Sequence, residues 1–187
     1  MLVELKIHAS AALSTESDKA MLLLKEKNGE RMLPILMSMR RASMLTLRHQ
    51  FSFPLPVPMS LADVSWQMLR TFDIRLKFVE LTAIKDGNFV CRIVGERAGE
   101  ERSLELCLAP DGLVMAVSAH CPIMIEEELL EAQYMHNVGD GSYALSISTL
   151  SRQMLKEALQ HAVANERYEM ASQLRDELAK RNLEENE

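Results

Sequence analysis

The residues that follow Gly141 form a different kind of sequence from those before it. From Ser148 to Asn182 the chain has no glycine and no proline, and apolar residues recur every three or four positions between charged ones. This spacing places the apolar side chains on one face of a helix. Asn165 and Glu166 interrupt the pattern, and asparagine commonly ends one helix or caps the next. The segment is therefore predicted to be an antiparallel helical hairpin.

The apolar faces of these two predicted helices are candidates for contact with another surface. Two short helices bury little apolar surface by themselves, and isolated helices of this length are marginal in water. They are expected to pack on the rest of the chain, on a second copy or on another protein. The residues predicted to make this contact are Leu155, Leu159, Val163, Tyr168, Ala171, Leu174, Arg175 and Leu178.

Turn signals organise the preceding part of the chain. Asn28-Gly29 and Asp86-Gly87 each stand between apolar runs. Such pairs tolerate the positive φ angles of tight hairpin turns, so each predicts a β-hairpin. Pro34 lacks an N–H donor, so its strand is expected either to lie at a sheet edge or to leave the sheet there. Strands are predicted over 2–7, 20–25, 31–36, 76–84, 88–94, 103–108 and 123–125, and helices over 37–49, 60–72, 111–120 and 126–133.

A hairpin followed by a helix thus occurs twice. Strands and helices do not alternate strictly, so the predicted class is α+β: duplicated β-rich units with helices on one side, followed by the C-terminal antiparallel helical hairpin. The glycines near residue 140 indicate a linker. The predicted organisation is a main domain over 1–136, a linker over 137–147, the hairpin over 148–182 and an acidic tail over 183–187.

Charge and cysteine usage restrict the partners. The formal net charge is -6, and an acidic surface repels nucleic acid, so binding to nucleic acid is expected to be weak. No apolar run approaches the roughly 20 residues of a membrane span. Cys91, Cys107 and Cys121 are odd in number and far apart, which indicates free thiols in a reducing compartment. We expect a cytoplasmic protein without membrane contact.

Arginine and methionine usage leaves alternatives open. Arg40, Arg41 and Arg48 lie on one predicted helix, where they form either a cationic face for a phosphate or an acidic partner, or a solvated helix face. The thirteen methionines suit irregular cores and adaptable interfaces alike. The five histidines show no metal-binding spacing.

Residues 165–178 read Asn-Glu-Arg-Tyr-Glu-Met-Ala-Ser-Gln-Leu-Arg-Asp-Glu-Leu. This segment resembles the UVR motif, a helical hairpin through which two nucleotide-excision repair proteins associate and which recurs in unrelated bacterial proteins. The resemblance implies association through the hairpin, with a protein partner or with a second copy in a homo-oligomer. It does not imply a role in DNA repair, because the motif occurs in proteins of different function.

Residues 1–133 resemble the bifunctional nuclease (BFN) domain family. The resemblance rests on the runs 22–26, 31–35 and 84–89, on the proline-rich connector 53–58 before a helix with Asp63, and on Cys121-Pro122-Ile123. It implies an α+β fold with a duplicated β-rich unit. It also implies hydrolysis of DNA or RNA, with Mg²⁺ or Mn²⁺ as the cofactor if this chain is active.

The chain departs from the family pattern at three places. Arg41 stands where the family has a carboxylate, Ala62 and Asp63 replace a His-Asp pair, and the run that ends at Asp111 keeps only its last aspartate. Metal-assisted hydrolysis needs several oxygen ligands. Asp63 and Asp111 are the candidate catalytic residues, and both also stand where helix starts favour an acid. The first hypothesis is a non-catalytic or weakly catalytic BFN-like protein that associates through its hairpin; the alternative is a metal-dependent nuclease.

Overall fold

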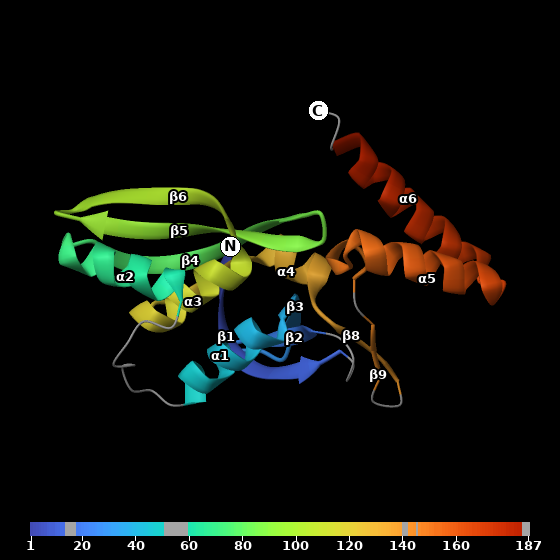
Figure 1. The fold of residues 1–187 in the computed structure, drawn as a ribbon, viewed down its shortest axis with the longest axis horizontal. Coiled ribbons are helices and arrows are strands. Elements are labelled where there is room, and N and C mark those ends of the chain that lie inside the picture. The colour runs from blue at the N-terminus through green and yellow to red at the C-terminus, as the bar shows by residue number, and fades with distance from the viewer. Residues whose placement is uncertain (14–17, 51–59, 140–141, 145, 185–187) are drawn as a thin grey trace.

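Two three-stranded antiparallel units form most of a seven-stranded sheet (Figure 1). The computed structural model describes residues 1–13, 18–50, 60–139, 142–144 and 146–184. The sheet order is β3-β2-β1-β7-β4-β5-β6, and β7 joins the units because it is antiparallel to β1 and parallel to β4. The strands are β1 (Leu2–Ala12), β2 (Lys19–Glu26), β3 (Met32–Ser38), β4 (Arg75–Lys85), β5 (Asn88–Arg97), β6 (Glu100–Leu108) and β7 (Ile123–Glu126).

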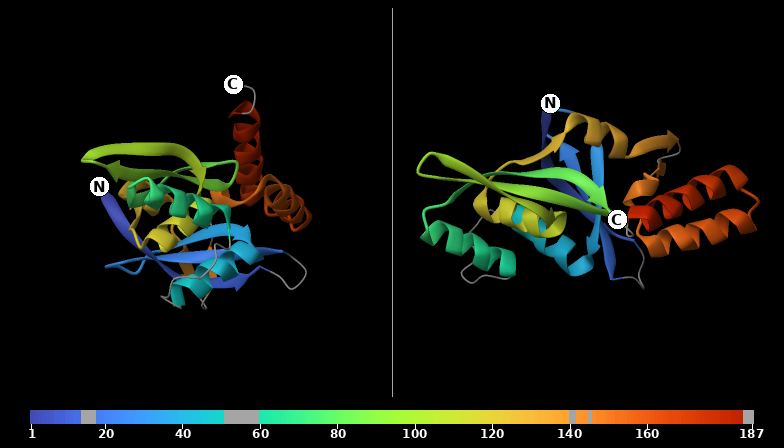
Figure 2. Two further views of the ribbon diagram at one scale, coloured as in Figure 1. Left: turned by 60° about the vertical axis from the view of Figure 1, so that its left-hand side comes forward. Right: turned by 90° about the horizontal axis from the view of Figure 1, so that it is seen from above.

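Each unit leads directly into a helix. α1 (Met39–Gln50) follows β3, and α3 (Ala109–Ala119) follows β6. α2 (Leu61–Thr71) precedes β4 and packs on α3. Figures 1 and 2 show the three helices between the two halves of the strongly twisted sheet. The predicted α+β class with a duplicated hairpin-and-helix unit is confirmed.

The two predicted hairpins form with different turns. Asp86 and Gly87 have φ angles of 48° and 72°, and Lys85 lies opposite Asn88, so this is the tight two-residue turn that the sequence predicts. The hairpin at residues 28 and 29 has a longer loop, because Lys25 lies opposite Met32. Neither loop residue has a positive φ.

The longer loop is held by the Arg31 side chain. Its Nε lies 3.0 Å from Glu26 Oε2, and its Nη1 lies 2.7 Å from Glu127 Oε1 and 3.0 Å from Glu131 Oε2. This network ties the loop to α4 (Glu127–Gln133). A contact across about a hundred residues therefore selects the loop geometry over the local dipeptide preference.

The main core lies between the sheet and α1 and α3. Leu22, Leu81 and Leu113 are fully buried there. Gly112 allows the close packing of α3 on β5, because a Cβ at this position would lie 2.4 Å from Cys91 Sγ. Burial raises the pKa of the Cys91 thiol to about 12. β3, which contains Pro34, is an edge strand, as predicted.

The C-terminal part begins with two short strands that the sequence analysis did not predict. β8 (His136–Gly139) and β9 (Ser142–Ala144) pair within the segment predicted to be a linker. Their pairing satisfies backbone groups, so it needs no apolar pattern in the sequence. α5 (Arg152–Ala164) and α6 (Tyr168–Glu184) follow a short 3₁₀ helix (Ile147–Thr149).

The two last helices pack antiparallel and extend from the body of the molecule (Figures 1 and 2), which confirms the predicted hairpin. The proline-rich connector 53–58 and residues 185–187 of the predicted acidic tail lie outside the described residues. Among the described helices, none combines the length and apolar character of a membrane span.

Candidate functional site

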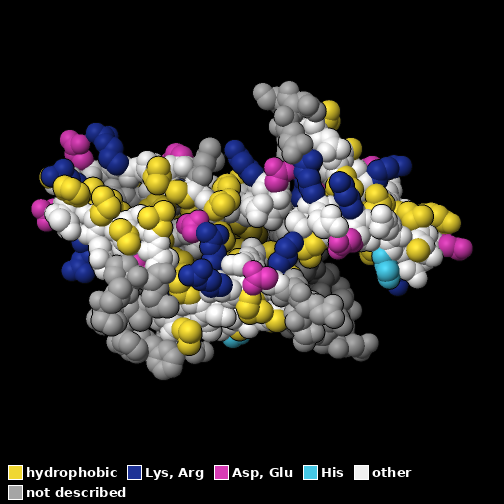
Figure 3. Space-filling view, viewed as in Figure 1, with side chains coloured by type: hydrophobic (Ala, Val, Ile, Leu, Met, Phe, Trp, Pro, Cys, Tyr) yellow, Lys and Arg dark blue, Asp and Glu magenta, His cyan; other side chains and the backbone are white. Residues whose placement is uncertain are grey.

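A cavity of about 780 Å³ lies where α1, α2 and α3 begin. We call it the three-helix cavity. The topology creates it, because both β-rich units deliver the first turn of a helix to the same place and α2 starts beside them. Its polar lining consists of Ser38, Arg40, Arg41, Ser60, Ser65 and Asp111. On the face of the molecule that Figure 3 shows, Lys and Arg side chains gather in the middle, beside a hydrophobic area over α2 and β6.

The three places where the sequence analysis expects a departure from the family pattern all contribute to this cavity. Arg41, Ala62 and Asp111 line it together although they come from three different helices. Arg41 Nη2 lies 3.1 Å from Asp111 Oδ1, and the two side chains are 43% and 49% exposed. The cavity therefore contains an arginine–aspartate ion pair in contact with solvent.

Asp63, the second candidate catalytic residue, is engaged elsewhere. It is buried, and its carboxylate forms a two-pronged ion pair with the guanidinium of Arg48 on α1. The Ser118 hydroxyl donates to Asp63 Oδ1 at 2.8 Å, and the Ser60 hydroxyl donates to Oδ2 at 2.9 Å. Each carboxylate oxygen thus accepts two hydrogen bonds, and the pair links α1, α2 and α3.

The protonation of Asp63 follows from these contacts. Burial by itself raises the pKa of the carboxyl group, but hydrogen bonds from Arg48, Ser118 and Ser60 outweigh burial and lower the pKa well below its usual range. Asp63 remains an anion at neutral pH. It also lies in the first turn of α2, where the N-cap Ser60 Oγ accepts a hydrogen bond from the Asp63 amide.

The residues present do not fit the Mg²⁺ or Mn²⁺ site that the family pattern implies. A divalent ion would have to replace Arg48 at Asp63 and approach Asp111 beside the positive charge of Arg41. Arg48 and Arg41 each repel a further positive charge at the aspartate that they contact. Among the residues that the structure describes, no three His, Cys, Asp or Glu side chains are grouped to hold a metal ion.

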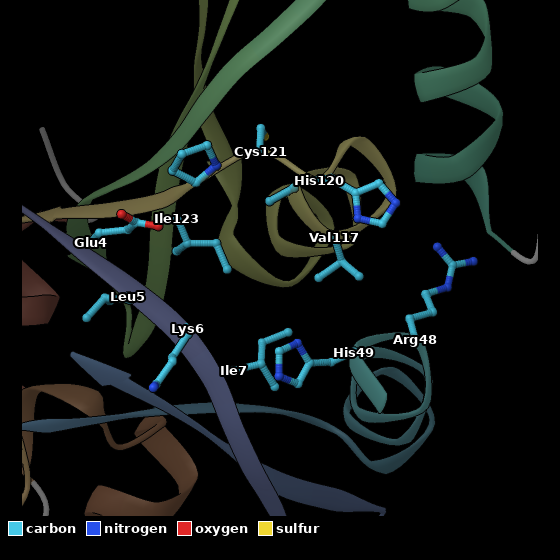
Figure 4. Close-up of a pocket in the computed structure, with 12 residues that line it drawn as sticks. Glu4, Leu5, Lys6, Ile7, Arg48, His49, Val117, His120, Cys121 and Ile123 are labelled. Atoms are coloured by element: carbon cyan, nitrogen blue, oxygen red, sulfur yellow. The ribbon is translucent and has the colours of Figure 1, made fainter. Parts of the chain in front are cut away.

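A second, smaller cavity of about 310 Å³ lies between β1 and the C-terminal ends of α1 and α3. Glu4, Arg48, His49 and His120 line it. Figure 4 shows that their polar ends do not converge: Arg48 points toward α2, and Glu4 and His120 lie on opposite sides. This cavity offers no grouped set of catalytic or ligating atoms.

Arg48 and Ser118 were missed as site residues by the sequence analysis. Arg48 was assigned to a cationic or solvated helix face, whereas its side chain is only 9% exposed. Residues 48, 63 and 118 lie on three separate helices. No local pattern can therefore reveal that their side chains meet.

The predicted contact residues of the hairpin fall into two groups. Leu155, Ala171 and Leu174 are buried between α5 and α6, and Leu159 and Leu178 pack against them. Val163 and Tyr168 are 53% and 69% exposed where the two helices join. The exposed Arg175 pairs with its neighbour Asp176.

We use the name hairpin tip for Val163, Tyr168 and Met170. Met170, which is 45% exposed, lies in the first turn of α6 and adds a third apolar side chain. Figure 3 shows hydrophobic side chains at the end of the hairpin that is farthest from the body. The hairpin thus has a core of its own and an unburied apolar tip.

The other end of the hairpin is attached to the β4–β5 turn. Arg181, 3% exposed, donates to the carbonyl oxygens of Leu150 at 2.7 Å and Ser148 at 2.9 Å. Arg152 forms an ion pair with Asp86 in the turn. A Cβ at Gly87 would lie 2.3 Å from the Leu150 carbonyl oxygen, so the close approach requires glycine. The base of the hairpin is fixed while the tip points away.

Comparison with known proteins agrees with this architecture. No curated protein matches the chain. The profile of the bifunctional nuclease domain matches residues 22–137, which is more than half of the 187 residues and includes the whole three-helix cavity. On this match the chain belongs to the bifunctional nuclease domain family.

Proposed function

We propose that this BFN-family protein has lost metal-dependent hydrolysis and acts in protein association, with its C-terminal hairpin as the contact surface. One observation carries the first part: both aspartates that could act as metal ligands are paired with arginines. The second part is supported by the apolar hairpin tip and by the resemblance of residues 165–178 to the UVR motif.

The ion pairs argue against hydrolysis in different ways. Asp63 is held by four hydrogen bonds in the interior, and removing it from Arg48 would leave a buried cation without a counter-charge. Asp111 is accessible but lies beside Arg41, which occupies the place of a family carboxylate. A single accessible carboxylate does not supply the oxygen ligands that a metal-bound water requires.

A nuclease assay tests the loss of hydrolysis. Purified full-length protein is incubated with single-stranded RNA and with single-stranded DNA in Mg²⁺ or Mn²⁺. We expect no cleavage above that of a buffer without protein. The matched control is Asp111→Asn, which removes the accessible carboxylate without touching the interior. Cleavage by the wild type that Asp111→Asn abolishes would establish the alternative function, a metal-dependent nuclease.

The hairpin is suited to association because its tip leaves apolar surface in water. Complete burial of an exposed apolar side chain contributes about 1.5–3 kcal/mol. Val163, Tyr168 and Met170 are about half to two thirds exposed, so burying the exposed part would contribute about 1–2 kcal/mol each, before the cost of ordering the partners. The hairpin core and the contact of Arg181 with the Leu150 carbonyl oxygen hold α5 and α6 together as one unit that carries the tip. A second copy of the chain presents the same tip, and self-association is the form that we propose.

Solution mass tests this association. The chain mass is 21.2 kDa, and we expect light scattering to give a multiple of it for the wild type. Tyr168→Asp with Val163→Asp places charges on the tip and should return the mass to that of the monomer. Leu174 is less suitable, because it is buried in the hairpin and its replacement would unfold the hairpin. Arg75→Gln, an exposed change on β4, is the control and should keep the oligomer. A monomeric wild type would contradict self-association.

A further inference from the structure

The three-helix cavity continues into a second space of about 720 Å³. The two share Leu69, Ile93, Leu104 and Met115 in their walls, so together they form one groove between α2 and β6. The groove is polar where the helices begin, apolar in its middle, and lined at its far end by charged side chains, among them Glu96, Arg97, Glu100 and Arg102. Each of the two spaces has the volume of a cavity in which a small molecule commonly binds.

The polar end of the groove carries an excess of positive charge. Arg40 and Arg41 lie in the first turn of α1, which contains no acidic residue. Arginines are unfavourable at this end of a helix, because the helix dipole is positive there. Asp111 is the one carboxylate among the described residues that line the three-helix cavity. Ser38, Ser60 and Ser65 also line this end, and the Ser60 and Ser65 hydroxyls donate to Asp63 and to the Leu61 carbonyl oxygen.

The Arg41–Asp111 contact can be exchanged for another. Both side chains are nearly half exposed, and ion pairs in contact with water are weak. An incoming acidic group can therefore take the place of Asp111 at Arg41, while Arg40, which is exposed, supplies a second cation. The polar end of the groove thus has two cations, Arg40 and Arg41, and one weakly held anion of the chain itself, Asp111.

The apolar part of the groove is lined by flexible aliphatic side chains. Met44, Met68 and Met115 are three of its members, and Leu104 and Met68 are 60% and 56% exposed. Methionine adapts to ligands of irregular shape. No aromatic side chain is found among the described residues that line either part. Nucleobases are usually held by stacking on aromatic rings, so this groove suits an alkyl chain better than a nucleotide.

We propose that the groove binds an amphipathic anion, with its acidic head at Arg40 and Arg41 and its alkyl chain along Leu69, Ile93 and Leu104. The head stands for the chemistry that a carboxylate and a phosphate monoester share, because arginine donates two parallel hydrogen bonds to either. The binding is non-covalent. It is independent of the hairpin and gives the cavity a role other than hydrolysis.

Calorimetric titration of the full-length protein with decanoate, below its micelle-forming concentration, tests the proposal. We expect saturable binding at one site. Arg41→Gln should weaken it at least about tenfold, because a charge-assisted hydrogen bond is lost. Asp111→Asn should strengthen it, because the competing internal anion is removed. Decyl phosphate is the second probe, and binding by either probe with these variant effects supports the proposal.

Matched controls test the acidic head and the alkyl chain of the ligand separately. Leu104→Ser should weaken binding about tenfold, whereas Leu183→Ser, at another exposed leucine on α6, should not change it. Acetate, a head without a chain, and decanol, a chain without an acidic head, should each bind at least tenfold more weakly than decanoate. Equal binding of decanol and decanoate, or an unchanged affinity in Arg41→Gln, would overturn the proposal. Binding that appears only with micelles would overturn it as well.

Discussion

Two of the arginine–aspartate pairs, Arg48–Asp63 and Arg41–Asp111, have the same chemistry and different surroundings. Arg48 and Asp63 are 9% and 8% exposed and are locked to α2 and α3 by serine hydroxyls. Arg41 and Asp111 are 43% and 49% exposed and make one contact of 3.1 Å. The buried pair joins three helices and is inaccessible, whereas the exposed pair lies in a cavity and can be displaced.

This difference in exposure gives Asp63 and Asp111 different roles, although the sequence makes both of them candidates for catalysis. The resemblance to a nuclease family is what makes both aspartates candidates. In the folded chain, Asp63 is a structural residue by its burial and its partners. Asp111 alone retains access to a ligand. The ability to act on a ligand thus depends on exposure more than on residue type.

The largest effect expected from this comparison follows from loss of the buried carboxylate. Asp63→Ala leaves the buried Arg48 guanidinium without its counter-charge, and breaking such a pair costs about 3–5 kcal/mol of unfolding free energy. Urea unfolding measures this loss, followed by the fluorescence of Trp66, which is the one tryptophan and lies on α2 beside Asp63. If Asp63→Ala lowered the unfolding free energy by less than about 1 kcal/mol, the buried pair would stabilise the fold no more than an exposed pair does.

A smaller effect is expected from pH. Because the pKa of Asp63 is lowered in the folded state, the pair's contribution is fully present above the ordinary aspartate pKa of about 4 and declines as the pH falls from there toward the lowered pKa. The stability difference between the wild type and Asp63→Asn should therefore narrow between pH 5 and pH 3. Urea unfolding at each pH measures it. A difference that stays constant over this range would contradict the lowered pKa.

The smallest effect is expected from the exposed pair. Asp111→Ala should change the unfolding free energy by less than about 1 kcal/mol, because solvent screens the Arg41–Asp111 contact. The same urea titration provides the measurement, and Asp63→Ala provides the scale. A destabilisation as large as that of Asp63→Ala would show that Asp111 also has a structural role and that the cavity cannot exchange its anion freely.

Local patterns predicted much of the fold. The tight turn at Asp86 and Gly87, the edge position of Pro34 and the helical hairpin all follow from residues that lie next to one another in the chain. The loop at Asn28 and Gly29 and the β8–β9 pair were not predicted in their observed form. The first depends on Arg31 reaching α4, and the second depends on backbone pairing without a side-chain pattern.

The sequence by itself determined the α+β class, the duplicated unit and the candidate residues Asp63 and Asp111, because periodicity, turn dipeptides and family motifs are written in short segments. Tertiary structure alone decided which aspartate is buried and which faces a cavity. It also decided that Arg48 meets Asp63 and that Arg41 meets Asp111. The physical reason is that burial and charge pairing arise between helices distant in the chain, and they set both the accessibility and the electrostatics of each carboxylate.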